Sequence, residues 1–318
     1  MPARIVTGRL AALVALVVLA LVLAGCGGEQ ATPTAGTGGS QGKLQVVASF
    51  YPIEYFARRI GGDRVEVFNP VPPGAEPHDL ELSPRTIERI QASDVLLYLG
   101  GGFQPAIDRS LETLEGSGLT AVDVSEGITK VPAVTEAGET EAGGLDPHVW
   151  LDPLNARVMA DNIEKALVEA DPANEAIYRA NADQLRAELD ALHAEFERGL
   201  ANCTHKEIVT SHAAFGYMAR RYGLVEVPIA GLSPEAEPSP ARLNEIIRFV
   251  REHGVEYVFF ETLASPRVAE VIANETGAKT LVLNPIEGLT EEQAAAGEDY
   301  FSLMRQNLAN LRTGLNCK

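Results

Sequence analysis

Basic residues are scarce in this chain, and the shortage argues against one class of partner. Lysine and arginine number 26 against 44 aspartates and glutamates, giving a formal net charge of −18. A surface of that sign repels a phosphate backbone, so no nucleic-acid partner is expected. The sequence also lacks internal repeats of solenoid period, and it has neither a His-Glu-x-x-His nor a Gly-x-Ser-x-Gly motif. These absences argue against a solenoid protein and against a hydrolase.

A long apolar stretch is lacking too. The longest run, Leu10 to Leu23, is shorter than the roughly 20 residues that a membrane-spanning helix needs. A basic segment precedes it, and it ends in Leu23-Ala24-Gly25-Cys26, which resembles a bacterial lipobox. The resemblance implies removal of residues 1–25, acylation of Cys26, and a protein anchored to the outer face of the bacterial cell membrane. A plain secretory signal with an incidental cysteine is the alternative.

Two cysteines remain if Cys26 carries lipid, namely Cys203 and Cys317. Thiols outside the cytoplasm meet an oxidising environment, so we predict a disulfide between them. It would tie the C-terminus to the body of the protein. Two free thiols are the alternative.

Strand and helix patterns alternate in two blocks. Short apolar or β-branched runs predict eight strands, four in each block, at residues 44–50, 64–68, 94–99, 120–124, 207–211, 225–229, 255–260 and 280–283. Ser83-Pro84 predicts the start of a helix, with serine as N-cap and proline at the first helical position. Two long helical patterns, 155–170 and 173–201, separate the blocks.

These patterns predict an α/β protein of two βα lobes, each a small, mostly parallel sheet flanked by helices, joined by a long rigid linking helix. In such lobes ligands bind at the carboxyl ends of the strands, so we expect the binding site in the cleft between them. The predicted divisions are a signal peptide with lipobox at 1–25, a flexible linker at 26–43, an N-terminal lobe at 44–154, linking helices at 155–202 and a C-terminal lobe at 203–318.

The segment Leu145 to Pro153 joins the first block to the linking helices. It reads Leu-Asp-Pro-His-Val-Trp-Leu-Asp-Pro and holds His148 and Trp150, the only tryptophan of the chain. A residue before proline prefers extended geometry, and two Asp-Pro pairs bracket the segment. We therefore predict a rigid extended segment in which Trp150 serves as scaffold.

Three of the six histidines stand where a predicted element ends and a loop begins. His78 follows a proline-rich loop, His148 follows an Asp-Pro pair, and His212 directly follows a strand. Imidazoles with a carboxylate suit zinc and its neighbours among the metals, so these three are candidate ligands of one ion. The sequence gaps are too long for local chelation, so the fold must bring them together. The alternative is that each is a solvated or hydrogen-bonded histidine.

Five segments resemble those of the zinc/manganese solute-binding lipoproteins of ABC importers. They are Gly74–Pro84, Asp146–Pro153, Ser211–Tyr217, Leu232–Pro240 and Leu283–Leu289. The resemblance extends from about residue 44 to the end of the chain. It implies two lobes bridged by a rigid helix, a metal ion bound between them, and delivery of that ion to a membrane permease powered by a cytoplasmic ATPase.

The resemblance also implies a ligand set. It makes His78, His148 and His212 ligands, and it makes Glu287 the candidate for the fourth, because Asn284 stands where many members have an aspartate. A solvated loop acid is the alternative for Glu287. Glu76 and Asp79 are candidates for orienting the His78 ring from outside the ligand set.

The ligand types point to Zn²⁺ as the transported ion. Manganese members tend to have a carboxylate at the position of His212, and manganese prefers more oxygen ligands, so Mn²⁺ is the alternative. The loop Val134 to Gly144 is acidic but has no histidine, so it is not expected to collect metal. The expected protein is a monomeric carrier and not an enzyme. A surface adhesin and a zinc hydrolase with three histidine ligands are the other readings.

Overall fold

The structure, a computed structural model, describes residues 42–114, 116, 118–134 and 140–318. The predicted signal peptide, Cys26 and the linker up to residue 41 lie outside the described residues, as does much of the loop 134–144. In the described part of the chain, no helix combines the length and the apolar character that crossing a membrane requires.

The first block forms a parallel sheet in the order β2-β1-β3-β4. Its strands are β1 (Leu44–Ala48), β2 (Val65–Phe68), β3 (Val95–Tyr98) and β4 (Thr120–Asp123). Its helices are α1 (Tyr51–Gly61), the 3₁₀ turn η1 (Gly62–Arg64), α2 (Pro84–Gln91) and α3 (Pro105–Leu114). Helix α2 begins where the sequence predicts, because the Ser83 side chain accepts a hydrogen bond from the Thr86 N–H.

The second block forms another parallel sheet, in the order β10-β9-β7-β8. Its strands are β7 (Glu207–Thr210), β8 (Val225–Pro228), β9 (Tyr257–Phe260) and β10 (Lys279–Val282). Its helices are α6 (Gly216–Tyr222), α7 (Pro240–His253), α8 (Arg267–Thr276), α9 (Glu291–Ala296) and α10 (Tyr300–Gly314). Numbered along their own blocks, the strands of the two sheets follow the same order.

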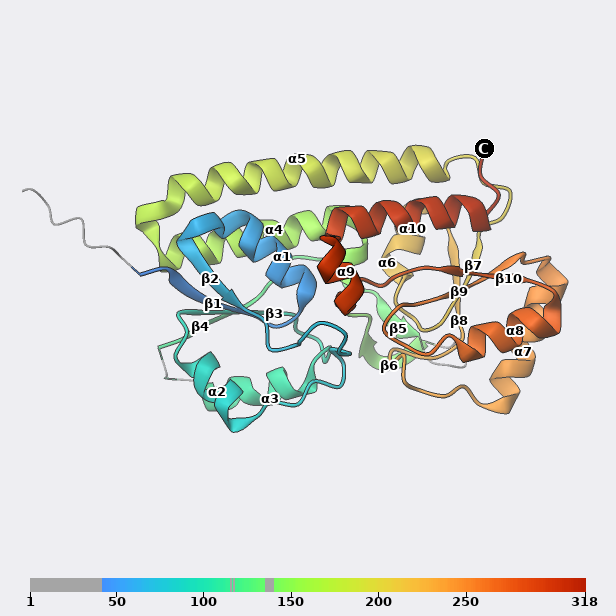
Figure 1. Cartoon of the computed structure of the whole chain (residues 1–318), viewed down its shortest axis with the longest axis horizontal. Coiled ribbons are helices and arrows are strands. Elements are labelled where there is room, and N and C mark those ends of the chain that lie inside the picture. Colours follow the sequence, from blue (N-terminus) through green and yellow to red (C-terminus); the bar gives the residue numbers. More distant parts are fainter. Residues whose placement is uncertain (1–41, 115, 117, 135–139) are drawn as a thin grey trace, which may run out of the picture. The chain divides into compact units, whose positions relative to one another are not determined.

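Two helices in sequence link the blocks, α4 (Pro153–Ala170) and α5 (Glu175–Leu200), with the 3₁₀ turn η3 (Pro172–Asn174) between them. Helix α5 packs against α1, α4 and α10, and Figure 1 shows α10 running beside it. The apolar residues of α5 recur at helical spacing and are buried in the same core as the first sheet and α10. Residues 42–318 accordingly form one compact unit. The predicted fold class is confirmed, while the lobe boundaries remain predictions.

The segment that joins the first block to α4 differs from its prediction. Val149–Leu151 form a 3₁₀ turn, η2, where the sequence predicts extended geometry. This turn buries Trp150 completely and lets its Nε1 donate to the Pro285 carbonyl at 2.7 Å. Burial of a large aromatic ring with a satisfied N–H outweighs the local preference for extended backbone. An antiparallel hairpin, β5 (Pro132–Val134) with β6 (Thr140–Leu145), also replaces part of the predicted acidic loop.

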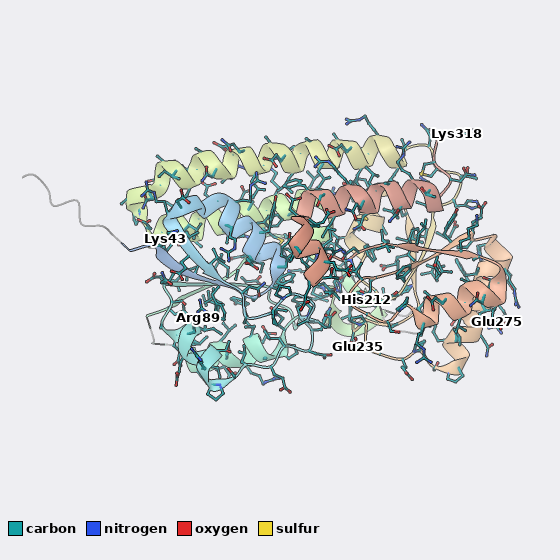
Figure 2. All side chains as sticks on the ribbon, in the orientation of Figure 1. Lys43, Arg89, His212, Glu235, Glu275 and Lys318 are labelled. Atoms are coloured by element: carbon teal, nitrogen blue, oxygen red, sulfur yellow. A yellow bond between two sulfur atoms is a disulfide. The ribbon has the colours of Figure 1, made fainter. Side chains whose placement is uncertain are left out.

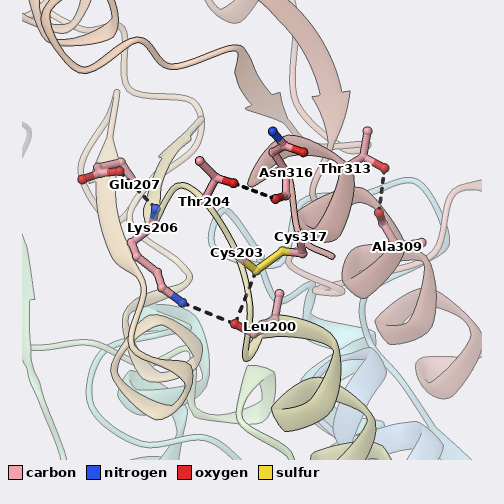
Figure 3. Close-up of a disulfide and its surroundings, with 9 residues drawn as sticks. All are labelled: Leu200, Cys203, Thr204, Lys206, Glu207, Ala309, Thr313, Asn316 and Cys317. Atoms are coloured by element: carbon pink, nitrogen blue, oxygen red, sulfur yellow. Dashed lines mark hydrogen bonds between the residues drawn. A yellow bond between two sulfur atoms is a disulfide. The ribbon is translucent and has the colours of Figure 1, made fainter.

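A disulfide joins Cys203 to Cys317 (Figure 3). Backbone bonds flank it: the Thr204 N–H donates to the Asn316 carbonyl, and the Lys318 N–H donates to the Asn202 carbonyl. The end of the chain is therefore fastened beside the turn between α5 and β7.

Candidate metal centre

The four side chains proposed as ligands from the sequence meet at one point. One donor atom from each of His78, His148, His212 and Glu287 lies within 4.8 Å of the others. Each side chain comes from a loop that follows a strand: β2, β6, β7 and β10 respectively. His212 lies between the two sheets in the view of Figure 2. The carboxyl ends of the strands therefore supply this cluster, as expected for α/β lobes.

Three of the four donor atoms are spaced as in the coordination sphere of zinc. Glu287 Oε1 lies 3.2 Å from His148 Nε2, 3.3 Å from His212 Nε2 and 3.5 Å from His78 Nε2. The Nε2 atoms of His148 and His212 are 3.4 Å apart. Ligands about 2.0–2.1 Å from a tetrahedral zinc ion stand roughly 3.3–3.4 Å from one another. Glu287, His148 and His212 therefore already stand at this spacing, and the His78 donor lies within 4.8 Å of all three.

Burying these polar side chains without a cation would cost free energy. The side chains of His148, His212 and Glu287 are at most 1% exposed. Both Glu287 oxygens and His78 Nε2 are buried without a hydrogen-bond partner. Buried polar atoms normally have partners, so atoms of this kind at a functional site call for a ligand. A divalent cation would satisfy them together.

Two of the imidazoles are oriented by buried carboxylates. Asp146 Oδ1 lies 2.8 Å from His148 Nδ1 and also accepts from the His148 N–H at 2.9 Å. Glu261 Oε1 lies 3.0 Å from His212 Nδ1. A carboxylate at Nδ1 holds the proton there and turns the lone pair of Nε2 toward the metal position. Sequence reasoning missed both roles, although Glu261 directly follows β9, at the edge where the histidines were sought.

The third imidazole has a different setting. Glu76 Oε1 accepts from the backbone N–H of His78 at 3.2 Å, so it holds the main chain of this loop and not the ring. Asp79, the other candidate for orienting the ring, is exposed. The His78 ring instead packs edge-on against Phe103, with ring centroids 4.6 Å apart.

Residues 46–314 match the family described as "ZnuA: Zinc-uptake complex component A periplasmic". The chain belongs to this family. The family resemblance predicted from the sequence is thereby confirmed, and the family is a zinc-binding component of transport systems that work with a permease and an ATPase.

Three known proteins illustrate the similarity. The high-affinity zinc uptake system protein ZnuA of Bacillus subtilis (strain 168) is 36% identical over 306 residues, 94% of this chain and 95% of that protein. The zinc-binding lipoprotein AdcA of Streptococcus pneumoniae is 35% identical over 280 residues, and the match covers 86% of this chain and 56% of AdcA. The Zn(II)-bound ZnuA-like domain of AdcA superposes with a TM-score of 0.76 at 36% identity, covering 86% of this chain and 100% of that one. The laminin-binding protein Lmb of Streptococcus agalactiae is described as bifunctional, with adhesin and metal transporting activity. Its structure superposes with a TM-score of 0.77 at 32% identity, covering 86% of this chain and 99% of that one.

In this member of the zinc-uptake family the surroundings of two imidazoles favour their protonated form. Burial disfavours the charged form of His148, but the nearby carboxylates of Asp146 and Glu287 outweigh it and raise its pKa. Burial acts likewise on His212, whose pKa is nevertheless raised well above its usual value by the nearby carboxylates of Glu261 and Glu287. Burial alone would raise the pKa of Glu287, yet the three imidazoles hold it well below its usual range. Zinc must therefore displace protons to bind.

The loop that carries Glu287 is held on several sides. Asn307 Oδ1 accepts from the Asn284 N–H at 2.8 Å, and Asn307 Nδ2 donates to the Asn284 carbonyl at 2.7 Å. Asn284 Oδ1 accepts from the N–H of Ile286, whose φ of 57° is unusual for a β-branched residue. Trp150 holds the carbonyl between them. This zinc-uptake protein thus maintains a strained backbone directly beside a proposed ligand.

Proposed function

We propose that this chain binds one Zn²⁺ outside the cytoplasm, through His78, His148, His212 and Glu287, and delivers it to the permease of an ABC importer. The observation that carries the proposal is the convergence of three Nε2 atoms on Glu287 Oε1 at 3.2–3.5 Å. The family match supports the transport role.

The donor set favours zinc over manganese. Three neutral imidazoles and one carboxylate leave a divalent ion with a net charge of +1, and imidazole suits zinc whereas manganese favours oxygen. The histidine at position 212 supplies nitrogen where manganese would prefer a carboxylate. Mn²⁺ is therefore expected to bind more weakly than Zn²⁺.

The carrier is further proposed to be a monomer anchored through lipid on Cys26, with residues 27–41 as a spacer, and to have no enzymatic activity. The lipobox-like Leu-Ala-Gly-Cys supports the anchor. The relative AdcA is named a lipoprotein. Globomycin treatment of producing cells, or a Cys26→Ala variant, would release the protein or change its processing if the anchor is present; unaltered processing would contradict it.

A titration of chelator-treated protein tests the metal assignment. Zn²⁺ and Mn²⁺ are added in competition with a chromophoric chelator, and ester and phosphate substrates are assayed in parallel. One tightly bound Zn²⁺ per chain, weaker Mn²⁺ and no turnover are expected. His253→Ala removes an exposed imidazole at the end of α7 and is the control that retains full affinity. Absence of zinc binding, or zinc-dependent turnover, contradicts the proposal.

A second candidate function is adhesion, favoured by the similarity to Lmb. It predicts that immobilised laminin retains the protein, and that it does so in a metal-binding variant such as His148→Ala if the two activities use different surfaces. No retention of either form by laminin would remove this candidate.

A further inference from the structure

Gly216, the first residue of α6, lies where the segment before α4 meets the second sheet. A Cβ atom added to it would stand 2.6 Å from Asp146 Oδ2 and 3.7 Å from Glu226 Oε2. The φ of Gly216 is not positive, so its backbone is open to any residue. What glycine supplies here is space for the carboxylate of Asp146.

The next residue holds the main chain of Asp146. The Tyr217 hydroxyl donates to the Asp146 carbonyl at 2.8 Å and accepts from the Val131 N–H at 3.2 Å. Gly216 and Tyr217 therefore form a seat for Asp146, which we call the Asp146 seat: one residue leaves room for its side chain and the other fixes its backbone.

The same place borders the turn that carries His212. Glu226 Oε1 accepts from the N–H groups of Ala214 and Phe215 at 3.1 and 2.9 Å, and from Thr210 Oγ1 at 3.1 Å. These bonds hold residues 211–215 in a non-helical turn, so α6 begins only at Gly216. Gly216 thus lies between the carboxylate that orients His148 and the turn that presents His212.

We propose that Gly216 is a positioning residue for zinc capture. Because glycine has no side chain, the Asp146 carboxylate can lie against the start of α6 and orient His148 so that its Nε2 faces the metal position. The inference rests on the proposed zinc function. It adds a residue that touches neither the metal nor a ligand ring, and whose role is to set the distance between the parts of the chain that bear His148 and His212.

The change Gly216→Ala separates this role from a merely structural one. Alanine has the higher helix propensity, so it does not weaken α6 by itself. Its methyl group must push the Asp146 carboxylate away, because a 2.6 Å contact is too short for a carbon and an oxygen. The metal-free protein should therefore unfold within a few degrees of wild type, while zinc affinity falls by about tenfold or more, as for loss of an outer partner of a metal ligand.

The decisive measurement is a double-mutant cycle on the full chain with Gly216→Ala, Asp146→Ala and the two combined. Zinc affinity comes from chelator competition, and the visible absorption of the Co²⁺ form reports ligand geometry. We expect the Co²⁺ bands of Gly216→Ala to change, and the double variant to bind zinc no more weakly than Asp146→Ala, because the methyl group then meets no carboxylate. Wild-type affinity in Gly216→Ala, or losses that simply multiply in the double variant, would overturn the inference.

Two more variants keep the test interpretable. Gly199→Ala, in α5, places a methyl group 2.9 Å from Leu308 Cδ1 of α10. It therefore imposes a similar close contact on a helix away from the site and should leave zinc affinity unchanged. Tyr217→Phe removes only the hydroxyl of the Asp146 seat and should weaken zinc binding about threefold even if Gly216→Ala folds poorly; full affinity there counts against the seat. Failure of wild type to bind zinc would instead contradict the proposed function.

Discussion

The three imidazoles of the site are not equivalent, and the contrast shows how the site is built. His148 and His212 are fully buried, and each has a carboxylate at Nδ1, Asp146 and Glu261. His78 sits on the proline-rich loop after β2, its side chain is 11% exposed, and it packs against an aromatic ring. Two ligands are thus oriented by the sheets before metal arrives, while the third depends on a loop.

That loop is connected to the fourth ligand. The Gly74 N–H donates to the Leu289 carbonyl at 2.8 Å, which joins the loop of His78 to the loop of Glu287. One half of the site is therefore the pair of linked loops that carry His78 and Glu287, in which the His78 ring has no orienting carboxylate. The other, the supported half, carries His148 and His212, whose rings are both held by carboxylates.

The largest effect is expected from removing a ligand of the supported half. His148→Ala should weaken zinc binding by more than about 100-fold, or about 2.7 kcal/mol, because the site loses a fully buried imidazole that Asp146 already orients. Chelator competition measures the affinity, and circular dichroism checks that the metal-free fold is retained. Binding within threefold of wild type in a folded variant would refute the role of His148.

Acidification tests both supported imidazoles together. Their pKa values are raised in the metal-free protein, so they bind protons at a higher pH than an ordinary histidine does. Protonated rings cannot bind metal; zinc affinity should therefore be full above the raised pKa values and fall as pH drops through them, starting above pH 6.5. Between pH 7.5 and 5.5 we expect a loss of about 100-fold. Glu287, whose pKa is lowered, stays ionised over this range. A flat profile would be incompatible with a histidine-rich site.

The outer carboxylates should matter less than the ligands they orient. Asp146→Asn and Glu261→Gln each keep an acceptor of similar shape but lose the charge that makes the ring basic. A loss of about 30-fold in zinc affinity is expected for each, within the range for such partners. Equal affinity in both variants and wild type would mean that burial alone orients the rings.

Among the ligands, removal of His78 is expected to cause the smallest loss of zinc affinity. His78→Ala should lower zinc affinity by about tenfold, since water can enter at this partly exposed position and take the place of the ring. Asp79→Ala is the matched control on the same loop, and its exposed side chain should change affinity less than twofold. If His78→Ala cost as much as His148→Ala, the contrast between the two halves would be wrong.

Much of the fold was predictable because short sequence patterns mark the strands and helices of α/β lobes. Each predicted strand is observed with ends shifted by one or two residues, and Ser83-Pro84 marks the start of α2 through its capping hydrogen bond. The β5–β6 hairpin and the turn at Val149–Leu151 were missed. The turn depends on the burial of Trp150 and on its bond to the distant Pro285 carbonyl, which short-range patterns do not encode.

The four metal ligands were predictable from the sequence, but the residues that position them were not. The positions of the three histidines at strand ends bring them together by topology, and the motif around Glu287 adds the fourth side chain. Asp146 was interpreted only through the proline that follows it, and nothing near Gly216 in the sequence reveals that its neighbour in space is a carboxylate 70 residues earlier. Partnerships of this kind depend on how the two sheets approach each other.

The single tryptophan has one more consequence. Its ring lies 5.3 Å from that of His148, and its N–H is bonded to the loop that carries Glu287. A metal ion bound to this imidazole changes the surroundings of the only indole in the chain, so metal binding is expected to alter its emission. The molecule therefore carries its own optical reporter, in contact with both halves of the site, and filling can be followed in unlabelled protein on the timescale of mixing.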